Sequence, residues 1–243
     1  MASPTRSTSD APRRKASRQL PVPEKTKVKD WRNAEGRNER SRLIHAALFT
    51  AAAEVVGTHG YEGASITLIT QRAGVAQGTF YNHFESRQDI LDQLLPRLGK
   101  EMLDYVGECS RQGSTLLERE ELGFRGFYAF LKAHPHFFRI LNEAPSFAPK
   151  AHQAHIDLVR DGYMRFLKRG LKTGEIKGFD EKELEVAAFV MMGARLYLGH
   201  FVTQADQSNG NSQDIPDWVT TAYCKLIKHG LAGPVDTQAQ PPK

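Results

Sequence analysis

Side chains able to hydrogen-bond bases and phosphates lie close together between positions 77 and 83 of the 243-residue chain. They are Gln77, Thr79, Tyr81, Asn82 and His83, and none of them is acidic. Side chains of these types bond to base edges in the major groove and to phosphate oxygens. Phe80 and Phe84 are four residues apart, so on a helix they share the opposite, inner face. The segment therefore predicts a short helix with a polar face suited to DNA.

The residues before this segment predict the element that positions it. Ile66, Ile69 and Ala73 fall on one face of a short helix, and Gly74 ends that helix. Val75 then fills the turn between the two helices. Two short helices joined by a Gly-containing turn are characteristic of the helix-turn-helix, which places its second helix in the major groove.

Residues 41–84, continued by Ser86 and Arg87, resemble the DNA-binding domain of the TetR family of bacterial repressors. The resemblance is closest in the run AGVAQGTFYNHF, which is similar to the family's recognition helix. Thr70 departs from the family, which has Ala there, and its hydroxyl is expected to bond the preceding turn. The resemblance implies the following contacts: Gln77, Gly78 and Asn82 to base edges, Thr79, Tyr81 and His83 to phosphates, and Arg42, Ser65, Thr67 and Arg87 to the DNA around them.

The rest of the folded part predicts helices throughout, because apolar side chains recur at helical spacing and no strand-like alternation appears. We expect an all-α protein, with a helix-turn-helix DNA-binding domain in residues 37–84. Residues 85–233 then form a helical ligand-binding and dimerisation domain, as the resemblance implies. The expected helices cover residues 38–58, 86 to beyond 106, 115–134, 135–141, 149–173, 180–204, and a last one from 214 or 217 to 230 or 233.

Single residues predict where these helices begin, end or bend. Ser86 is expected to cap the long helix that follows it. Pro96 lies inside that helix and is expected to kink it, because it removes one backbone hydrogen bond. Gly57 and Gly60 are expected to end the first helix. Pro135 suits the first position of a short helix.

Charge is concentrated at the N-terminus. Residues 1–36 contain nine Lys and Arg and four Asp and Glu, so the net charge of this segment is +5. The net charge of the whole chain is also +5. This segment is rich in Ser, Thr and Pro and offers few apolar side chains to bury, so we expect residues 1–36, like residues 234–243, to be disordered. Two interpretations of the basic tail stay open: a solvated leader, or an arm that follows phosphates or enters the minor groove.

The middle helices carry many aromatic and methionine side chains, which either fill a core or line an elongated apolar cavity. Under the second interpretation, Arg195 is the buried cation available to a carboxylate or phosphate. We then expect a small apolar or aromatic effector, including anionic molecules such as acyl chains. The residues expected to bind it are Phe127, Phe138, Phe166, Met191, Met192 and Arg195.

A homodimer is expected, because one helix-turn-helix reads too few base pairs for useful specificity. The helices that begin near Asp180 and Asp217 combine small side chains, which allow close approach, with bulky ones. Two copies of this helix pair predict a four-helix interface; the alternative is that the pair only completes each subunit's core. The side chains concerned are Ala187, Ala188, Gly193, Ala194, Ala222, Trp218, Tyr223, Leu226 and Ile227.

We interpret the chain as a ligand-responsive repressor that binds a near-palindromic operator and has no enzymatic activity, cofactor or metal. Two alternatives stay open. His152 and His155 share a helix face, as a metal pair in an all-helical enzyme would. Cys109 or His200 could be imagined as a further ligand, but neither has local spacing. A protein of the membrane surface would account for the basic tail, but not for the polar side chains of residues 77–83.

The composition also bears on the cellular compartment. Two cysteines, Cys109 and Cys224, provide neither a disulfide framework nor zinc-finger spacing. No apolar run reaches the roughly 18 residues of a membrane span, and no apolar stretch follows the N-terminal basic residues as in a secretory signal. These features predict a cytoplasmic protein.

Overall fold

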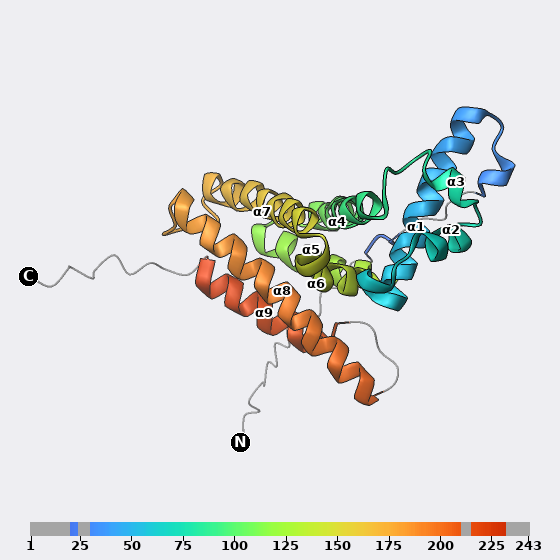
Figure 1. Ribbon diagram of the computed structural model, residues 1–243. Helices are drawn as coiled ribbons and strands as arrows, with labels where there is room; N and C mark the ends of the chain where they lie inside the picture. The colour runs from blue at the N-terminus through green and yellow to red at the C-terminus, as the bar shows by residue number, and fades with distance from the viewer. Residues whose placement is uncertain (1–19, 24–29, 210–214, 232–243) are drawn as a thin grey trace, which may run out of the picture.

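The computed structural model describes residues 20–23, 30–209 and 215–231, and for residues 202–209 the backbone alone. Every regular element in these residues is a helix, which confirms the all-α prediction. Helices α1–α3 lie at one end of the molecule, and α4 leads from them into a body built from α4–α9 (Figure 1). The elements are η1 (Trp31–Asn33), α1 (Arg37–Gly63), α2 (Ile66–Ala73), α3 (Gln77–Phe80), α4 (Arg87–Arg111), α5 (Leu116–Ala133), α6 (Phe137–Phe147), α7 (Pro149–Lys172), α8 (Glu181–Asn209) and α9 (Asp217–Leu231).

One apolar core connects the two ends of the molecule. Phe80 and Phe84 from the helix-turn-helix belong to the same buried cluster as Leu94 of α4 and Ile140 of α6. A second cluster lies deeper in the body, where buried side chains such as Leu167 of α7 pack against α5, α8 and α9. Because the first cluster is continuous, a change of packing in the body can reach the helices that carry the polar face.

The first helix continues past Gly57, contrary to expectation. At Gly57 the helix lies directly against the His136 ring, since a Cβ built on this glycine would be 2.0 Å from His136 Nδ1. The interruption comes at Gly60, whose φ of 75° and ψ of 171° are non-helical. Only glycine adopts such a conformation without strain. Gly57 therefore serves a close approach of α1 to the body, and Gly60 provides the bend.

The prolines also differ in part from expectation. Pro135 does not begin α6, because the helix starts at Phe137 after a turn closed by the Phe137 N–H donating to the His134 carbonyl, 3.0 Å. Pro149 does occupy the first turn of α7. Helix α4 extends as one helix through Pro96, and Ser86 caps it by accepting from Asp89 N–H at 3.1 Å, as expected.

Part of the segment expected to be disordered is ordered. Residues 31–33 form the single turn η1, and the Trp31 Nε1–H donates to the Ala73 carbonyl at 3.4 Å. The guanidinium carbons of Arg32 and Arg40 lie 4.7 and 5.1 Å from the Trp31 ring centroid. Further upstream, the Tyr105 hydroxyl donates to the Pro21 carbonyl at 2.7 Å. The packing of the Trp31 indole on α2 offsets the conformational entropy that residues 31–33 lose on ordering. The composition of the segment as a whole did not indicate this. The remainder of residues 1–36 and residues 234–243 lie outside the described residues.

Candidate functional site

The predicted helix-turn-helix is held together by local hydrogen bonds. Ser65 caps α2, its hydroxyl oxygen accepting from the Leu68 N–H at 3.2 Å. Gly74 adopts the left-handed conformation that ends α2, with φ of 68°. The Val75 N–H then donates to the Thr70 carbonyl at 3.0 Å, and the Thr70 hydroxyl bonds the Ile66 carbonyl at 2.9 Å. The turn is therefore specified by residues within it, which is why the sequence predicted it.

The second helix of this motif is shorter than the predicted polar segment. Helix α3 ends at Phe80, and residues 81–83 continue as a turn closed by the Phe84 N–H donating to the Phe80 carbonyl, 3.0 Å. Phe80 and Phe84 are buried, so the remaining side chains are directed outward. Gln77, Gly78, Tyr81 and Asn82 are exposed, and Thr79 and His83 are half-buried. The structure thus brings the six predicted residues onto one accessible surface, which we call the reading face.

Two features of the reading face suit close contact with another molecule. The Gln77 side-chain amide donates to the Thr67 hydroxyl at 2.7 Å, which joins the beginnings of α2 and α3. Both residues are exposed. Gly78 has only open space around the position of a Cβ, so its lack of a side chain is not required by the fold. A free glycine on an exposed helix leaves room for a ligand's surface to approach the backbone.

Arg87 has a different position from the one expected. Its guanidinium lies against the end of α1, where it donates to the carbonyls of Tyr61, Ala64 and Glu62, the last two at 2.5 and 3.2 Å. A guanidinium bonded in this way braces the α1–α2 connection. The phosphate contact expected of Arg87 stays a prediction. Arg42 stays exposed on α1, and Ser65 is exposed while its hydroxyl caps α2.

His45, which the sequence reasoning missed, packs behind the reading face. His45 of α1 stacks on Phe84, with centroids 5.1 Å apart and rings 14° from parallel, and lies 5.9 Å from His83. Burial, with smaller effects of Arg97 and His83, lowers the pKa of His45, and burial lowers the pKa of His83. Both imidazoles are therefore neutral at pH 7, and His83 offers a hydrogen bond rather than a charge. The signal in the sequence was the four-residue spacing of His45 and Phe49, whose rings contact edge-on.

Four of the six residues predicted to bind an effector are divided between two packing clusters, and the binding role of all six stays a prediction. Phe166 and Met192 pack against the second cluster, in which Met191 is buried. Phe127 belongs to the first cluster. Phe138 is half-buried against Gly199, where a Cβ would lie 2.6 Å from its Cζ. The prediction therefore groups side chains that the fold divides between two regions.

Arg195 is not the available cation that the sequence suggested. Its Nη2 donates to Glu120 Oε1 at 2.8 Å, and both side chains are buried. The Tyr223 hydroxyl donates to the same oxygen at 2.7 Å. A buried carboxylate thus neutralises the guanidinium. Sequence reasoning missed Glu120 because it precedes Arg195 by 75 residues.

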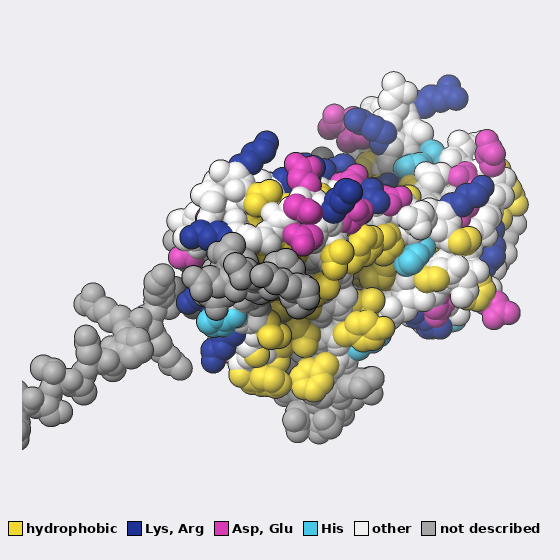
Figure 2. All heavy atoms as spheres, turned by 90° about the vertical axis from the view of Figure 1, so that its left-hand side faces the viewer, with side chains coloured by type: hydrophobic (Ala, Val, Ile, Leu, Met, Phe, Trp, Pro, Cys, Tyr) yellow, Lys and Arg dark blue, Asp and Glu magenta, His cyan; other side chains and the backbone are white. Residues whose placement is uncertain are grey.

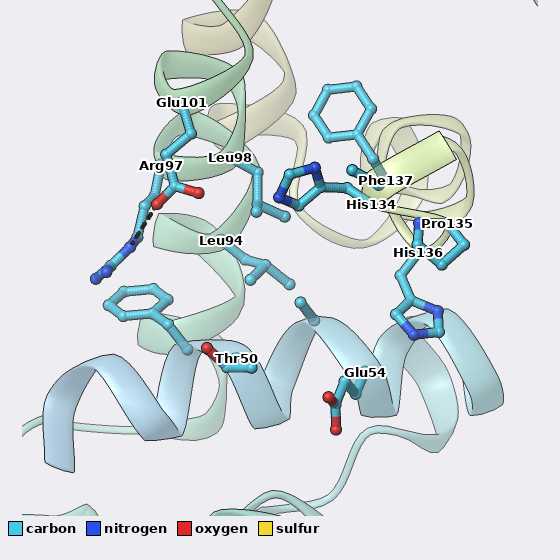
Figure 3. A pocket seen from close by; sticks show the side chains of 13 residues that line it. Thr50, Glu54, Leu94, Arg97, Leu98, Glu101, His134, Pro135, His136 and Phe137 are labelled. Carbon is cyan, nitrogen blue, oxygen red and sulfur yellow. Dashed lines mark hydrogen bonds and ion pairs between the residues drawn. The ribbon is translucent and has the colours of Figure 1, made fainter. Parts of the chain in front are cut away.

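A cavity of about 300 Å³ lies where the helix-turn-helix end meets the body. It is bounded by α1, α4 and the turn between α5 and α6, and Figure 3 shows His134 pointing towards Leu98 of α4 and His136 towards α1. Arg97 and Glu101 form an ion pair of 3.4 Å at its edge. None of the six predicted effector residues lines this cavity.

Helices α8 and α9 expose large apolar side chains. Figure 2 shows hydrophobic side chains gathered on one face of the body. Of the side chains predicted at an interface, Trp218 and Leu226 are exposed, whereas Ala188 and Tyr223 are buried within the subunit. We call the exposed set the apolar face; it consists of Val186, Phe189, Val190, Tyr197, Phe201, Trp218 and Leu226.

The alternative of a metal-dependent enzyme gains no support from the described residues. Within them, no group of three or more His, Cys, Asp or Glu side chains could hold a metal ion. His155, one of the imagined metal pair, is buried against Phe137 and Gly99. No described helix combines the length and the apolar character that a membrane crossing needs.

Comparisons with known proteins agree with this geometry. Residues 48–94 match the model of the family described as bacterial regulatory proteins, tetR family. The uncharacterised HTH-type transcriptional regulator YhgD of Bacillus subtilis (strain 168) is 26% identical over 164 residues, which cover 66% of this chain and 81% of YhgD. The fatty acid metabolism regulator protein of the same organism is 26% identical over 149 residues, covering 57% of this chain and 74% of that protein.

A solved structure shows the same fold. The crystal structure of the transcriptional regulator FadR from Bacillus subtilis in complex with stearoyl-CoA has a TM-score of 0.63 to this chain at 21% identity. The match covers 79% of this chain and 100% of that one. It therefore extends over the body as well as the helix-turn-helix.

Proposed function

Because the chain belongs to the TetR family of bacterial transcriptional regulators, we propose that it is a repressor that binds a near-palindromic operator as a homodimer and leaves it when an effector binds. The observation that carries the proposal is the reading face, six outward residues fixed on the buried Phe80 and Phe84. Residues 37–84 bind DNA in this proposal, and residues 85–233 bind the effector and the second subunit. The relatives support a regulator rather than an enzyme. A regulator that binds bacterial DNA would act in the cytoplasm.

The homodimer follows from the reading face and the apolar face together. One reading face contacts a single major groove, whereas two faces related by a twofold axis contact both halves of a near-palindrome. Exposed apolar side chains on α8 and α9 are the type of surface that a subunit interface covers. Whether the basic tail contacts DNA is a separate question, which footprinting with residues 1–30 removed would answer.

We propose an effector with an apolar chain, bound in the body near the second cluster. Phe166, Met191 and Met192 meet there on α7 and α8. The FadR structure contains stearoyl-CoA, and a relative is named a fatty acid metabolism regulator, which supports acyl compounds as the first class to test. A compound that binds the protein but leaves its operator affinity unchanged is not the effector.

The first experiment is footprinting of the chain on its own upstream DNA, followed by substitution of Tyr81, which is 58% exposed. Tyr81→Ala should weaken operator binding by about 1–3 kcal/mol, because ring and hydroxyl contacts are both lost. Tyr81→Phe, which keeps the ring, should bind with intermediate affinity. Gln77→Ala should instead relax base preference at one position of each half-site. Unchanged operator binding by a folded Tyr81→Ala variant would contradict the assignment of the reading face.

A further inference from the structure

The cavity of about 300 Å³ at the joint between the helix-turn-helix end and the body has the features of a ligand site. Its walls are one side of α1, the middle of α4 and residues 133–137, which connect α5 to α6. Small-molecule sites have volumes of roughly 300–1,000 Å³, so an occupant of this one is small. The cavity is separate from the region of Phe166, Met191 and Met192, because none of these residues lines it.

Most of the cavity wall is apolar. Phe49, Leu94 and Phe137 are buried behind it, and Ala53 and Leu98 are half-buried at its surface. Figure 3 shows Leu94 and Leu98 of α4 between α1 and the turn that leads into α6. An apolar group that enters the cavity is removed from water and contacts side chains on both sides of the joint. The wall therefore suits the apolar part of a ligand.

Two hydrogen-bond acceptors lie together at one end of the cavity. Glu101 of α4 and His134 line both this cavity and a neighbouring hollow, so the two side chains are adjacent. His134 Nδ1 lies 3.1 Å from the Phe130 carbonyl, which can only accept. Nδ1 thus carries the hydrogen, and Nε2 of the neutral ring is an acceptor. Glu101 accepts from Arg97 Nε through Oε1, whereas its Oε2 has no hydrogen-bond partner among the described residues.

Arg97 does not fill this end of the cavity. Its guanidinium carbon lies 4.5 Å from the centroid of the Phe49 ring, and Figure 3 shows the side chain directed away from His134 and His136. Its bond to Glu101 is 3.4 Å long, against about 2.7–2.9 Å for a strong charge-assisted bond. Glu101 therefore keeps the capacity for a second and shorter bond to a cation.

We propose that this cavity binds a small amine with an apolar body, whose ammonium group donates to Glu101 Oε2 and His134 Nε2, and that its occupancy changes operator affinity. An ammonium group has three N–H donors and a positive charge, so it bonds both acceptors and compensates the Glu101 carboxylate. A carboxylate of the same size would meet a like charge and a ring nitrogen that carries no hydrogen. The site is distinct from that of the acyl effector proposed above, and only its effect on DNA rests on the proposed function.

The position of the cavity connects its occupant to the reading face. Helix α1 packs against the turn between α5 and α6 here, with Gly57 directly against the His136 ring. A ligand in the cavity touches α1 on one side and α4 and the turn on the other. If it binds one arrangement of these elements more tightly than another, it shifts the protein towards that arrangement and changes the affinity for DNA.

The test measures the binding of two probes that share a phenyl ring, 2-phenylethylamine and 3-phenylpropionate, to the full-length protein without DNA. At pH 8 and constant ionic strength an ordinary imidazole is neutral, and the amine should bind at least about tenfold more tightly than the acid. Glu101→Gln keeps the size of the side chain and should weaken amine binding about tenfold. Ala53→Leu fills the cavity from α1 and should abolish amine binding without lowering the melting temperature.

Glu121→Gln is the matched control. Glu121 forms an ion pair with Arg125 four residues on, at 3.2 Å, and does not line the cavity. This variant should bind the amine as the parent does. Equal binding of amine and acid by the parent, binding of neither probe, equal weakening by Glu101→Gln and Glu121→Gln, or undiminished binding by Ala53→Leu overturns the inference.

Operator titrations with and without saturating amine measure the regulatory effect. The amine should change operator affinity at least about fivefold, and the change should disappear in Ala53→Leu. An amine that binds the parent but leaves operator affinity unchanged overturns the proposed regulation. The two questions stay apart, because the binding of the probes is measured without DNA: the absence of any footprint contradicts the proposed function and not the amine site.

Discussion

At the scale of single residues, a substitution of Gly78 distinguishes an effect on folding stability from an effect on DNA binding. Apart from the adjoining residues and the backbone of its own helix, no atom lies within 4 Å of the position that a Cβ would occupy there. Gly78→Ala should therefore leave the melting temperature unchanged or slightly raised, since alanine favours helix. It should reduce operator affinity about tenfold, because a methyl group on the reading face prevents close approach to the base pairs. Thermal unfolding and gel shifts measure the two effects, and equal affinity of variant and parent would remove Gly78 from the contact surface.

His155 makes the stability of the body depend on pH. Burial, with a smaller effect of His152, lowers the pKa of His155 to about 4, against 6.5 for the free side chain. Between pH 4 and pH 6.5, His155 is therefore protonated in the unfolded chain and neutral in the folded chain. The neutral form of His155 thus contributes about 3 kcal/mol to the free energy of unfolding. This contribution is fully present above pH 6.5 and is lost as the pH falls to 4.

Urea unfolding at pH 7.5 and pH 5 measures this effect. When the pH falls from 7.5 to 5, the free energy of unfolding of His155→Gln should decrease by about 2 kcal/mol less than that of the parent. His152→Gln is the control. Because His152 makes only the smaller contribution to the lowered pKa of His155, this variant should keep most of the pH dependence of the parent. A parent and a His155→Gln variant with the same pH dependence would show that another group is responsible.

At the scale of elements, α6 holds the end of α1 at its bend. Arg139 Nη1 donates to the carbonyls of Gly57 and Thr58 at 3.2 and 2.9 Å, and its Nε donates to Glu143 at 2.7 Å. Glu143 in turn accepts from the Tyr61 N–H at 2.8 Å. These bonds lie on either side of Gly60, so the body contacts the helix-turn-helix end through α6 as well as through α4. The expected effect of Pro96 on α4 stays a prediction.

Arg139→Ala should destabilise the protein by about 1–2 kcal/mol and lower its operator affinity, because α1 loses hydrogen bonds at its bend and is less firmly oriented. Arg160→Ala removes an equally large cation from the surface ion pairs with Asp157 and Asp161 and should cost less than about 1 kcal/mol. Unfolding curves and operator titrations of both variants give the comparison. If the two substitutions have equal effects, α6 does not fix the orientation of the helix-turn-helix end.

At the scale of the whole molecule, the apolar face predicts the dimer. Leu226 is 74% exposed on α9, so a charge there should leave the subunit folded. Leu226→Glu should shift the protein from dimer to monomer at micromolar concentration in sedimentation experiments, and weaken binding to the full operator. Ala194 is a less suitable position, because it packs against the first cluster within the subunit.

Ala154→Glu provides the control, since Ala154 is exposed on α7, outside the apolar face. It should sediment as the parent does. A parent that is monomeric at micromolar concentration would contradict the dimer model outright. A parent dimer that resists Leu226→Glu would place the interface on another surface.

The sequence by itself determined the helix-turn-helix and the all-α class, because both depend on local interactions. The cap at Ser65 and the left-handed Gly74 are specified by residues at most four positions away, and the four-residue spacing of Phe80 and Phe84 puts both rings on one face. Helical periodicity is likewise local, so most helices were predicted near their observed positions. Helix α6, however, begins at Phe137 and ends at Phe147 instead of covering residues 135–141, and α8 extends to Asn209 instead of ending near residue 204. Gly57 was misinterpreted because the residue it accommodates, His136, lies in the distant turn between α5 and α6.

The tertiary structure decided which polar groups are free and which are engaged. Arg87 and Arg195 both looked available in the sequence, but the carbonyls at the end of α1 hold the first and Glu120 holds the second. Such pairings join residues 23 and 75 positions apart, and no spacing rule connects them. The cost of burying a charge or a polar group depends on all the neighbours that folding brings together. For that reason the reading face could be predicted from the sequence, whereas the ion pair of Glu120 and Arg195 could not.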